Sequence, residues 1–132
     1  MSDRAIYLDS SAILKLVYTE DETEALKEFL REWPRRTSSV LARVEVMRAA
    51  RQVGDDLVLR HARDVLDGID FVLLDPNTIE RAARIDPLVR SRDAIHLATA
   101  LSLEPTVGGL VVYDVRLARA ARAAGIEVWA PA

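Results

Sequence analysis

The chain has 132 residues, of which 50% are hydrophobic and 30% are charged, with five glycines and five prolines. This composition excludes a largely disordered chain and fits one globular domain, which we expect to span residues 1–132. The sequence contains no cysteine, so disulfides, thiolate metal sites and cysteine nucleophiles are excluded. A net charge of −3 argues against binding to nucleic acid through bulk positive charge alone.

Apolar stretches along the chain are short. None approaches the roughly 20 residues that a membrane-spanning helix needs, because Arg, Asp or Glu interrupts each of them. The first nine residues carry acids on both sides of a short apolar run and lack the features of a signal peptide. We therefore expect a cytoplasmic protein without membrane association.

The first half of the chain alternates strand and helix patterns. Pro34 and Gly54 stop two of the helices, and Ser38 or Ser39 can cap the helix between them. In chain order the patterns predict a strand over 5–9, a helix through Val17, a helix over 21–33, a strand over 36–38, a helix over 40–53 and a helix over 55–68.

The second half continues this alternation. The predicted elements are a strand over 69–74, a helix from Pro76 to a stop or kink at Pro87, a helix over 92–103, a strand over 110–113 that Gly108 and Gly109 precede, a helix over 116–124 and a strand over 126–129. The strands are expected to be apolar on both faces, which is typical of a parallel sheet covered by helices on each side. The predicted fold class is therefore α/β, a three-layer α/β/α sandwich with a central parallel sheet of about five strands.

Four acidic residues follow strands or lie within apolar helix patterns. Asp9 and Asp114 end two apolar strands, and ligands of parallel sheets collect at such strand ends near the topological switch point. Glu45 lies toward the apolar stripe of its helix, and Asp93 opens a helix that is otherwise almost wholly apolar. Because an Asp at a strand end or helix start also caps the helix, each residue alone has a structural explanation.

The four carboxylates together point to metal chemistry. Gathered in one cleft they would repel one another unless cations lay between them. Carboxylate oxygens suit Mg²⁺ or Mn²⁺, which support hydrolysis of phosphodiesters with one or two bound ions. Two classes of protein that form an aspartyl-phosphate fit poorly. A phosphatase needs a second Asp where this chain has Ser11, and a receiver domain needs a Lys at the end of a late strand, whereas the only lysines here are Lys15 and Lys27.

Four motifs carry a family resemblance. They are YLDSSA at residues 7–12, SVLARVE at 39–45, RSRDAIHLATA at 90–100 and VYD at 112–114, the last followed by Arg116 and Leu117. Through these motifs the chain resembles the PIN domain along nearly its whole length, and more closely the VapC toxins of type II toxin–antitoxin pairs.

The resemblance implies a Mg²⁺- or Mn²⁺-dependent endoribonuclease that acts as a toxin, with a metal site formed by four matching acids. These are Asp9, Glu45, Asp93 and Asp114. At the matching position Ser10 is expected to position Asp9 or a water. Val112 stands where the family often has Thr or Ser, so a hydroxyl contact near Asp114 is expected to be missing.

The resemblance also implies partners. They are an RNA substrate, a second copy in a homodimer and a VapB-like antitoxin whose tail covers the active site. Apolar side chains near the first acid either form the antitoxin groove or belong to the core, and core is favoured for most of them. They are Leu14, Val17, Tyr18, Leu26 and Leu30.

The overall function and several individual residues each allow a second interpretation. The main alternative to the enzyme is a catalytically inactive PIN-like module that binds RNA or protein. His96 is expected to be a packed helix histidine instead of a metal ligand or base. A solvated helix face is favoured over phosphate contacts for Arg116, Arg119 and Arg122, and core packing is favoured over base stacking for Trp33 and Trp129.

Overall fold

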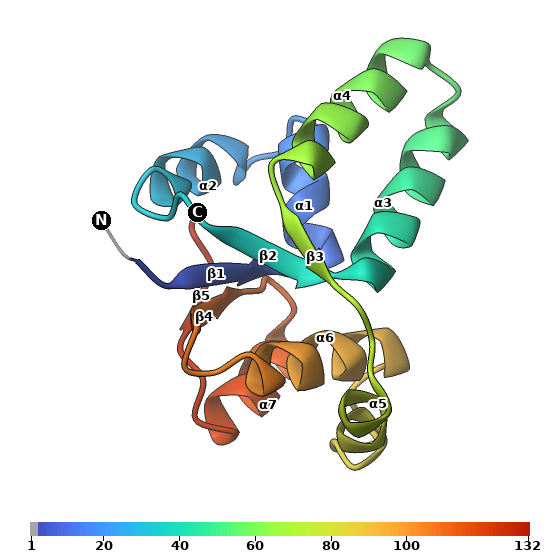
Figure 1. Cartoon of the computed structure of the whole chain (residues 1–132). Helices are drawn as coiled ribbons and strands as arrows, with labels where there is room; N and C mark the ends of the chain where they lie inside the picture. Colours follow the sequence, from blue (N-terminus) through green and yellow to red (C-terminus); the bar gives the residue numbers. More distant parts are fainter. Residues whose placement is uncertain (1–2) are drawn as a thin grey trace.

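A parallel five-stranded sheet lies between two layers of helices in a computed structural model, which describes residues 3–132. The elements in chain order are β1 (Ala5–Leu8), α1 (Ser10–Val17), α2 (Thr23–Leu30), β2 (Arg36–Ser39), α3 (Val40–Val53), α4 (Asp56–Asp67), β3 (Asp70–Val72), α5 (Pro76–Ala83), α6 (Ser91–Ser102), β4 (Val107–Val111), α7 (Val115–Ala123) and β5 (Val128–Trp129). Figure 1 shows α1–α4 against one face of the sheet and α5–α7 against the other. The predicted three-layer α/β/α sandwich is confirmed.

The strand order β3-β2-β1-β4-β5 places β1 at the centre of the sheet. The chain moves outward from β1 to β3 through α1–α4, then returns through α5 and α6 to β4 and continues through α7 to β5. Because crossovers between parallel strands are right-handed, the two directions of travel place their helices on opposite faces. The direction in which the chain adds strands to the sheet therefore changes between β1 and β4. The carboxyl ends of these two neighbouring parallel strands lie side by side between the helical layers (Figure 1).

The central strand β1 is buried on both faces, as its apolar sequence predicts. Ile6 and Leu8 point into the apolar cluster beneath α1–α4. Ala5 and Tyr7 alternate with them and join the cluster formed with α6 and α7. A strand buried in this way holds the residue that follows it, Asp9, in a fixed place between the layers.

The strand β2 differs from the prediction that the strands are apolar on both faces. Its sequence is Arg-Thr-Ser-Ser, and the last three side chains are buried. The Thr37 hydroxyl donates to the Asp70 carbonyl at 2.8 Å, and the Ser38 hydroxyl donates to the Leu8 carbonyl at 2.6 Å. The Ser39 side chain caps α3, which decides between the two predicted caps. Because each hydroxyl is hydrogen-bonded, β2 can be polar inside the sheet.

The strand β4 begins at Val107, earlier than predicted, so Gly108 and Gly109 lie within it. Trp33, Trp129 and Phe29 pack over this part of the sheet with ring centroids 5.5 to 6.2 Å apart. A Cβ on Gly109 would overlap the Trp129 ring, and one on Gly108 would lie 2.7 Å from the Trp33 ring. The glycines therefore make room for the tryptophans, which pack against the core as predicted.

Other bounds differ by a few residues from the prediction. The helix α5 ends at Ala83, before Pro87, and α2 ends at Leu30. The strands β3 and β5 are shorter than predicted because each lies at an edge and pairs with one neighbour only.

Replacing Gly109 by Ala should destabilise the fold, because its Cβ would force the Trp129 ring out of the aromatic cluster. We expect a loss of roughly 1–3 kcal/mol, as for other overpacked cores. Gly68→Ala is the matched control, since its Cβ would meet only the Val65 carbonyl oxygen at 3.5 Å. Urea denaturation of both variants measures the difference, and equal stabilities would contradict the proposed packing.

Candidate active site

The four acidic residues singled out in the sequence line one cavity near the carboxyl ends of β1 and β4. Asp9 directly follows β1, Asp114 follows β4 after two residues, Asp93 lies in the first turn of α6 and Glu45 lies on α3. The cavity has a volume of about 160 Å³. Its other lining residues are Ser10, Ser11, Leu14, Ala49, Arg90, Arg92 and His96. Four separate segments therefore contribute one carboxylate each.

Asp9 is the most deeply buried of the four acids, with 3% of its surface exposed. Its Oδ1 caps α1, because it accepts hydrogen bonds from the Ala12 N–H at 2.8 Å and the Ser11 hydroxyl at 2.9 Å. Burial raises the pKa of Asp9 in spite of these hydrogen bonds, and the charge of Asp93 adds to the shift. The ionised form of Asp9 is therefore less stable in the fold than in water.

Asp114 and Asp93 also lie at helix N-termini. The Oδ1 of Asp114 accepts from the Leu117 N–H at 2.8 Å and caps α7, so this residue has the structural role that a strand-end Asp often has. Asp93 accepts a hydrogen bond from Nε of Arg90 at 2.9 Å. Each of these contacts involves one carboxylate oxygen, so the second oxygen of Asp114 and of Asp93 remains available to bind a ligand.

Glu45 is held by three neighbouring side chains. Its Oε1 accepts from the Ser10 hydroxyl and lies 3.1 Å from Nε2 of His96, and its Oε2 lies 3.6 Å from Nη1 of Arg92. Partial burial opposes ionisation, but these contacts outweigh it and hold the pKa of Glu45 below its usual value. Ser10, which was expected to position Asp9 or a water, donates its hydroxyl to Glu45.

His96 does more than pack. It is 1% exposed, as predicted for a core histidine, yet both ring nitrogens reach polar side chains of the site. Nδ1 lies 2.8 Å from the Tyr7 hydroxyl oxygen, and Nε2 lies 3.0 Å from the Ser10 hydroxyl oxygen in addition to its contact with Glu45. The sequence signal for this was its position one helical turn after Asp93.

Two arginines without an assigned role in the sequence analysis lie among the acids. Arg90 pairs with Asp93, whose hydrogen bond and charge raise the pKa of Arg90, and Arg92 pairs with Glu45. Within residues 3–132, no group of three or more His, Asp or Glu side chains lies close enough together to hold a metal ion. The two arginines therefore provide the positive charge beside Asp93 and Glu45. The only sequence signal for this role was that Arg90 and Arg92 closely precede Asp93.

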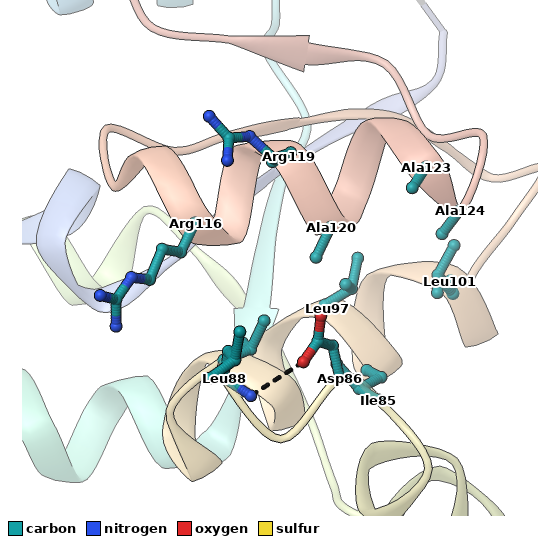
Figure 2. Close-up of a pocket in the computed structure, with 11 residues that line it drawn as sticks. Ile85, Asp86, Leu88, Leu97, Leu101, Arg116, Arg119, Ala120, Ala123 and Ala124 are labelled. Atoms are coloured by element: carbon teal, nitrogen blue, oxygen red, sulfur yellow. Dashed lines mark hydrogen bonds between the residues drawn. The ribbon is translucent and has the colours of Figure 1, made fainter.

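A larger and mostly apolar cavity of about 520 Å³ lies between α6, α7 and the loop before α6 (Figure 2). Arg116 and Arg119 of α7 are among its lining residues, and Figure 2 shows their guanidinium groups pointing away from the apolar side chains. A second cavity of about 510 Å³ borders both. It shares Leu88 and Arg116 with the apolar cavity, and Arg90, Asp93 and Asp114 with the acid cavity. Arg116, Arg119 and Arg122 are exposed, as the solvated helix face predicts.

The groove suggested on the first two helices is largely core. Val17, Leu26 and Leu30 are buried in the apolar cluster beneath α1–α4, so they form no surface groove. Leu14 and Tyr18 are partly exposed and pack against the same cluster. Core packing, which was favoured for most of these residues, is confirmed.

Comparison with known proteins is consistent with this architecture. The family model for the PIN domain matches residues 6–123. The chain is 44% identical over 128 residues to Ribonuclease VapC46 of Mycobacterium tuberculosis, a match that covers 96% of this chain and 98% of the relative. It is 37% identical over 131 residues to Ribonuclease VapC47 of the same species, with 96% of each chain covered.

Two solved structures share the fold. A toxin–antitoxin complex from Klebsiella pneumoniae matches with a TM-score of 0.73 and 23% identity, covering 97% of this chain and 98% of the other. The VapC20 toxin of Mycobacterium tuberculosis, described as cleaving the sarcin–ricin loop, matches with a TM-score of 0.70 and 17% identity, covering 93% of this chain and 97% of the other.

Asp9→Asn should stabilise the metal-free protein at pH 7. The amide keeps an oxygen for the helix cap and removes a carboxylate whose pKa the fold raises, so the Tm should increase. Ionised Asp9 lowers stability only above the carboxyl pKa of the unfolded chain, which is about 3.9. The difference from wild type should therefore shrink as the pH falls toward that value, as measured by thermal denaturation in EDTA.

Asp75→Asn is the matched control for this measurement. Asp75 caps α5 through the same contact, with its Oδ1 2.8 Å from the Thr78 N–H, but it is exposed and lines no part of the acid cavity. Hydrogen bonds from Thr78 lower the pKa of Asp75, so this substitution should decrease the Tm at pH 7. Shifts of the same sign in both variants would contradict the assigned burial effect at Asp9.

Proposed function

The chain belongs to the PIN domain family, and from this membership we propose that it is a Mg²⁺- or Mn²⁺-dependent endoribonuclease, the toxin of a toxin–antitoxin pair. The observation that carries the proposal is the single cavity lined by carboxylates from four separate segments at the switch point of the sheet. The relatives named as VapC ribonucleases, which match over nearly the full chain, support the reaction class.

The donor set fits a hard divalent cation. Asp9, Glu45, Asp93 and Asp114 would hold the metal, because carboxylate oxygens are the ligands that Mg²⁺ and Mn²⁺ prefer. A bound cation would also favour the ionised form of Asp9, whose pKa is raised by burial and, to a smaller extent, by the charge of Asp93. When bound, the metal supplies positive charge to the phosphate oxygens and to the attacking water.

Two arginines have a second role in this proposal. Arg90 and Arg92 pair with Asp93 and Glu45 through side chains that are 58% and 56% exposed, so they can swing away when a cation takes their place. A guanidinium group released at the mouth of the cavity is suited to bidentate contact with an RNA phosphate. The arginines therefore hold the acids in the metal-free protein and meet the substrate in the loaded one.

The partners follow from the same family membership. We assign to the chain a VapB-like antitoxin, a homodimeric state, a cytoplasmic location and a single domain over residues 1–132. The structural neighbour described as a toxin–antitoxin complex supports the antitoxin partner. No helix in the described part of the chain is long and apolar enough to cross a membrane.

The alternative is a PIN-like module that binds RNA or protein without turnover. Such a module would not need to keep all four acids, whereas here all four line the cavity. A single measurement, cleavage of RNA by the purified protein, distinguishes the two functions.

Purified protein free of antitoxin should cut total cellular RNA with Mg²⁺ or Mn²⁺ and stop in EDTA. Asp9→Asn should lose about 100-fold or more in rate, because loss of metal charge at the phosphate costs several kcal/mol. Asp75→Asn, a cap of the same kind outside the cavity, should keep the wild-type rate. A folded wild type that cuts nothing with either metal would support the binding module instead.

Mn²⁺ should raise the Tm of the wild-type protein. At about 100 times its Kd a ligand that binds only the folded state adds about 2.7 kcal/mol of stability. Asp93→Asn should remove most of this shift, because it takes one donor from the cavity. Thermal denaturation at increasing Mn²⁺ measures the effect, and an undiminished shift in the variant would exclude Asp93 as a ligand.

A further inference from the structure

One buried side chain beside the acid cavity has no role in the proposed metal site. His96 lies on α6 at 1% exposure, and each of its ring nitrogens has a polar partner. Tyr7, which is fully buried on the central strand β1, contacts Nδ1, and the two rings meet edge to face with centroids 5.8 Å apart. The histidine therefore joins the centre of the sheet to the acid cavity.

The hydrogen bonds determine which ring nitrogen carries the proton. The Tyr7 hydroxyl oxygen accepts from the Ser39 N–H at 3.0 Å. Oε1 of ionised Glu45, 3.1 Å from Nε2 of His96, can only accept, so Nε2 carries a proton. Burial raises the pKa of Tyr7 far above its usual value, so its hydroxyl keeps its proton and can donate it to Nδ1 of His96 at 2.8 Å. Nδ1 is then the acceptor, and the neutral imidazole carries its proton on Nε2.

The Nε2 proton faces the acid cavity. It lies toward Oε1 of Glu45 at 3.1 Å and the Ser10 hydroxyl oxygen at 3.0 Å, and Ser10 itself donates to the same carboxylate oxygen. His96 in this form has no lone pair left for a cation or a substrate proton, because its only lone pair accepts from Tyr7. The geometry argues against a metal ligand or a general base and favours a donor.

We propose that His96 is a positioning residue for the reaction proposed above: its Nε2–H holds Oε1 of Glu45, and the Tyr7 hydroxyl gives Nδ1 a partner in the tautomer that makes this possible. Glu45 is thereby fixed through one oxygen, and Oε2, now 3.6 Å from Nη1 of the exposed Arg92, is the oxygen that a cation can take. Partners that orient a metal-binding carboxylate in this way commonly contribute 10- to 100-fold to metal affinity.

The same hydrogen bonds hold α3 at two points. Ser39, the cap of α3, donates its N–H to Tyr7, and Glu45 lies on the same helix and meets His96. The path from Ser39 through Tyr7 and His96 back to Glu45 thus closes a loop across β1, α3 and α6. Such a loop limits the motion of the Glu45 carboxylate more than the exposed Arg92 can.

The first test is NMR of the imidazole nitrogens in the wild-type, metal-free protein. The chain has two histidines, so the His96 signals are assigned by comparison with His61→Gln. We expect His96 in the Nε2–H form in both the wild type and Tyr7→Phe, because Oε1 of Glu45 can only accept from Nε2. An Nδ1–H form in the wild type would overturn the proposal. This result does not depend on whether the protein binds metal or cuts RNA.

The second test compares two amides at position 96. Gln places its amide nitrogen near the position of Nε2, and Asn reaches only the position of Nδ1. We expect His96→Asn to weaken Mn²⁺ affinity about 10- to 100-fold in calorimetric titration and His96→Gln to stay within about threefold. His61→Gln, at the exposed histidine that contacts the Leu16 carbonyl, is the control and should bind as wild type.

The outcomes separate the two proposals. Equal losses in His96→Asn and His96→Gln, with both variants folded by circular dichroism, would mean that His96 only packs and would overturn its positioning role. A wild type that binds no Mn²⁺ would overturn the metal site and with it the role of His96. Rescue by Gln together with the Nε2–H tautomer is the combination that only a positioning donor produces.

Discussion

Burial of carboxylates around a cavity of about 160 Å³ is the constraint that the surrounding structure meets. Its effect is clearest at Asp9, where burial raises the pKa and the charge of Asp93 adds a smaller part. Three of the four acids, Asp9, Asp93 and Asp114, lie at helix N-termini, which favour negative charge, and Glu45 accepts a hydrogen bond from Ser10. Each carboxylate is thus stabilised by local contacts while all four line the same cavity.

The rigid part of this arrangement begins in the sheet. Tyr7 is buried on one face of the central strand and its neighbours Ile6 and Leu8 are buried on the other, so the end of β1 has little freedom. The polar strand β2 satisfies its hydroxyls inside the sheet and delivers Ser39 to Tyr7. Apolar packing therefore sets the place of the site, and a small polar network sets the direction of its side chains.

The outer part of the arrangement is more adaptable. Arg90 and Arg92 are exposed where they pair with the acids, and a second cavity continues from Asp93 and Asp114 along α7 to Arg116. The arginine side chains are exposed although their carboxylate partners are mostly buried, so each guanidinium group can return to water when a cation takes over its carboxylate. The proposed change from metal-free to loaded protein requires these arginines to leave and the carboxylates that line the cavity to close around the cation.

The sequence by itself determined the fold class, most element bounds within a few residues, and which four acids line one cavity, because periodicity, caps and strand ends are short-range signals. It could not predict that Gly108 and Gly109 lie within a strand, since the tryptophans that need the space come from distant segments. Nor could it assign His96 or the two arginines. Only the tertiary structure decided these partners, because Tyr7 and His96, 89 residues apart, meet across a sheet whose strand order no local pattern encodes.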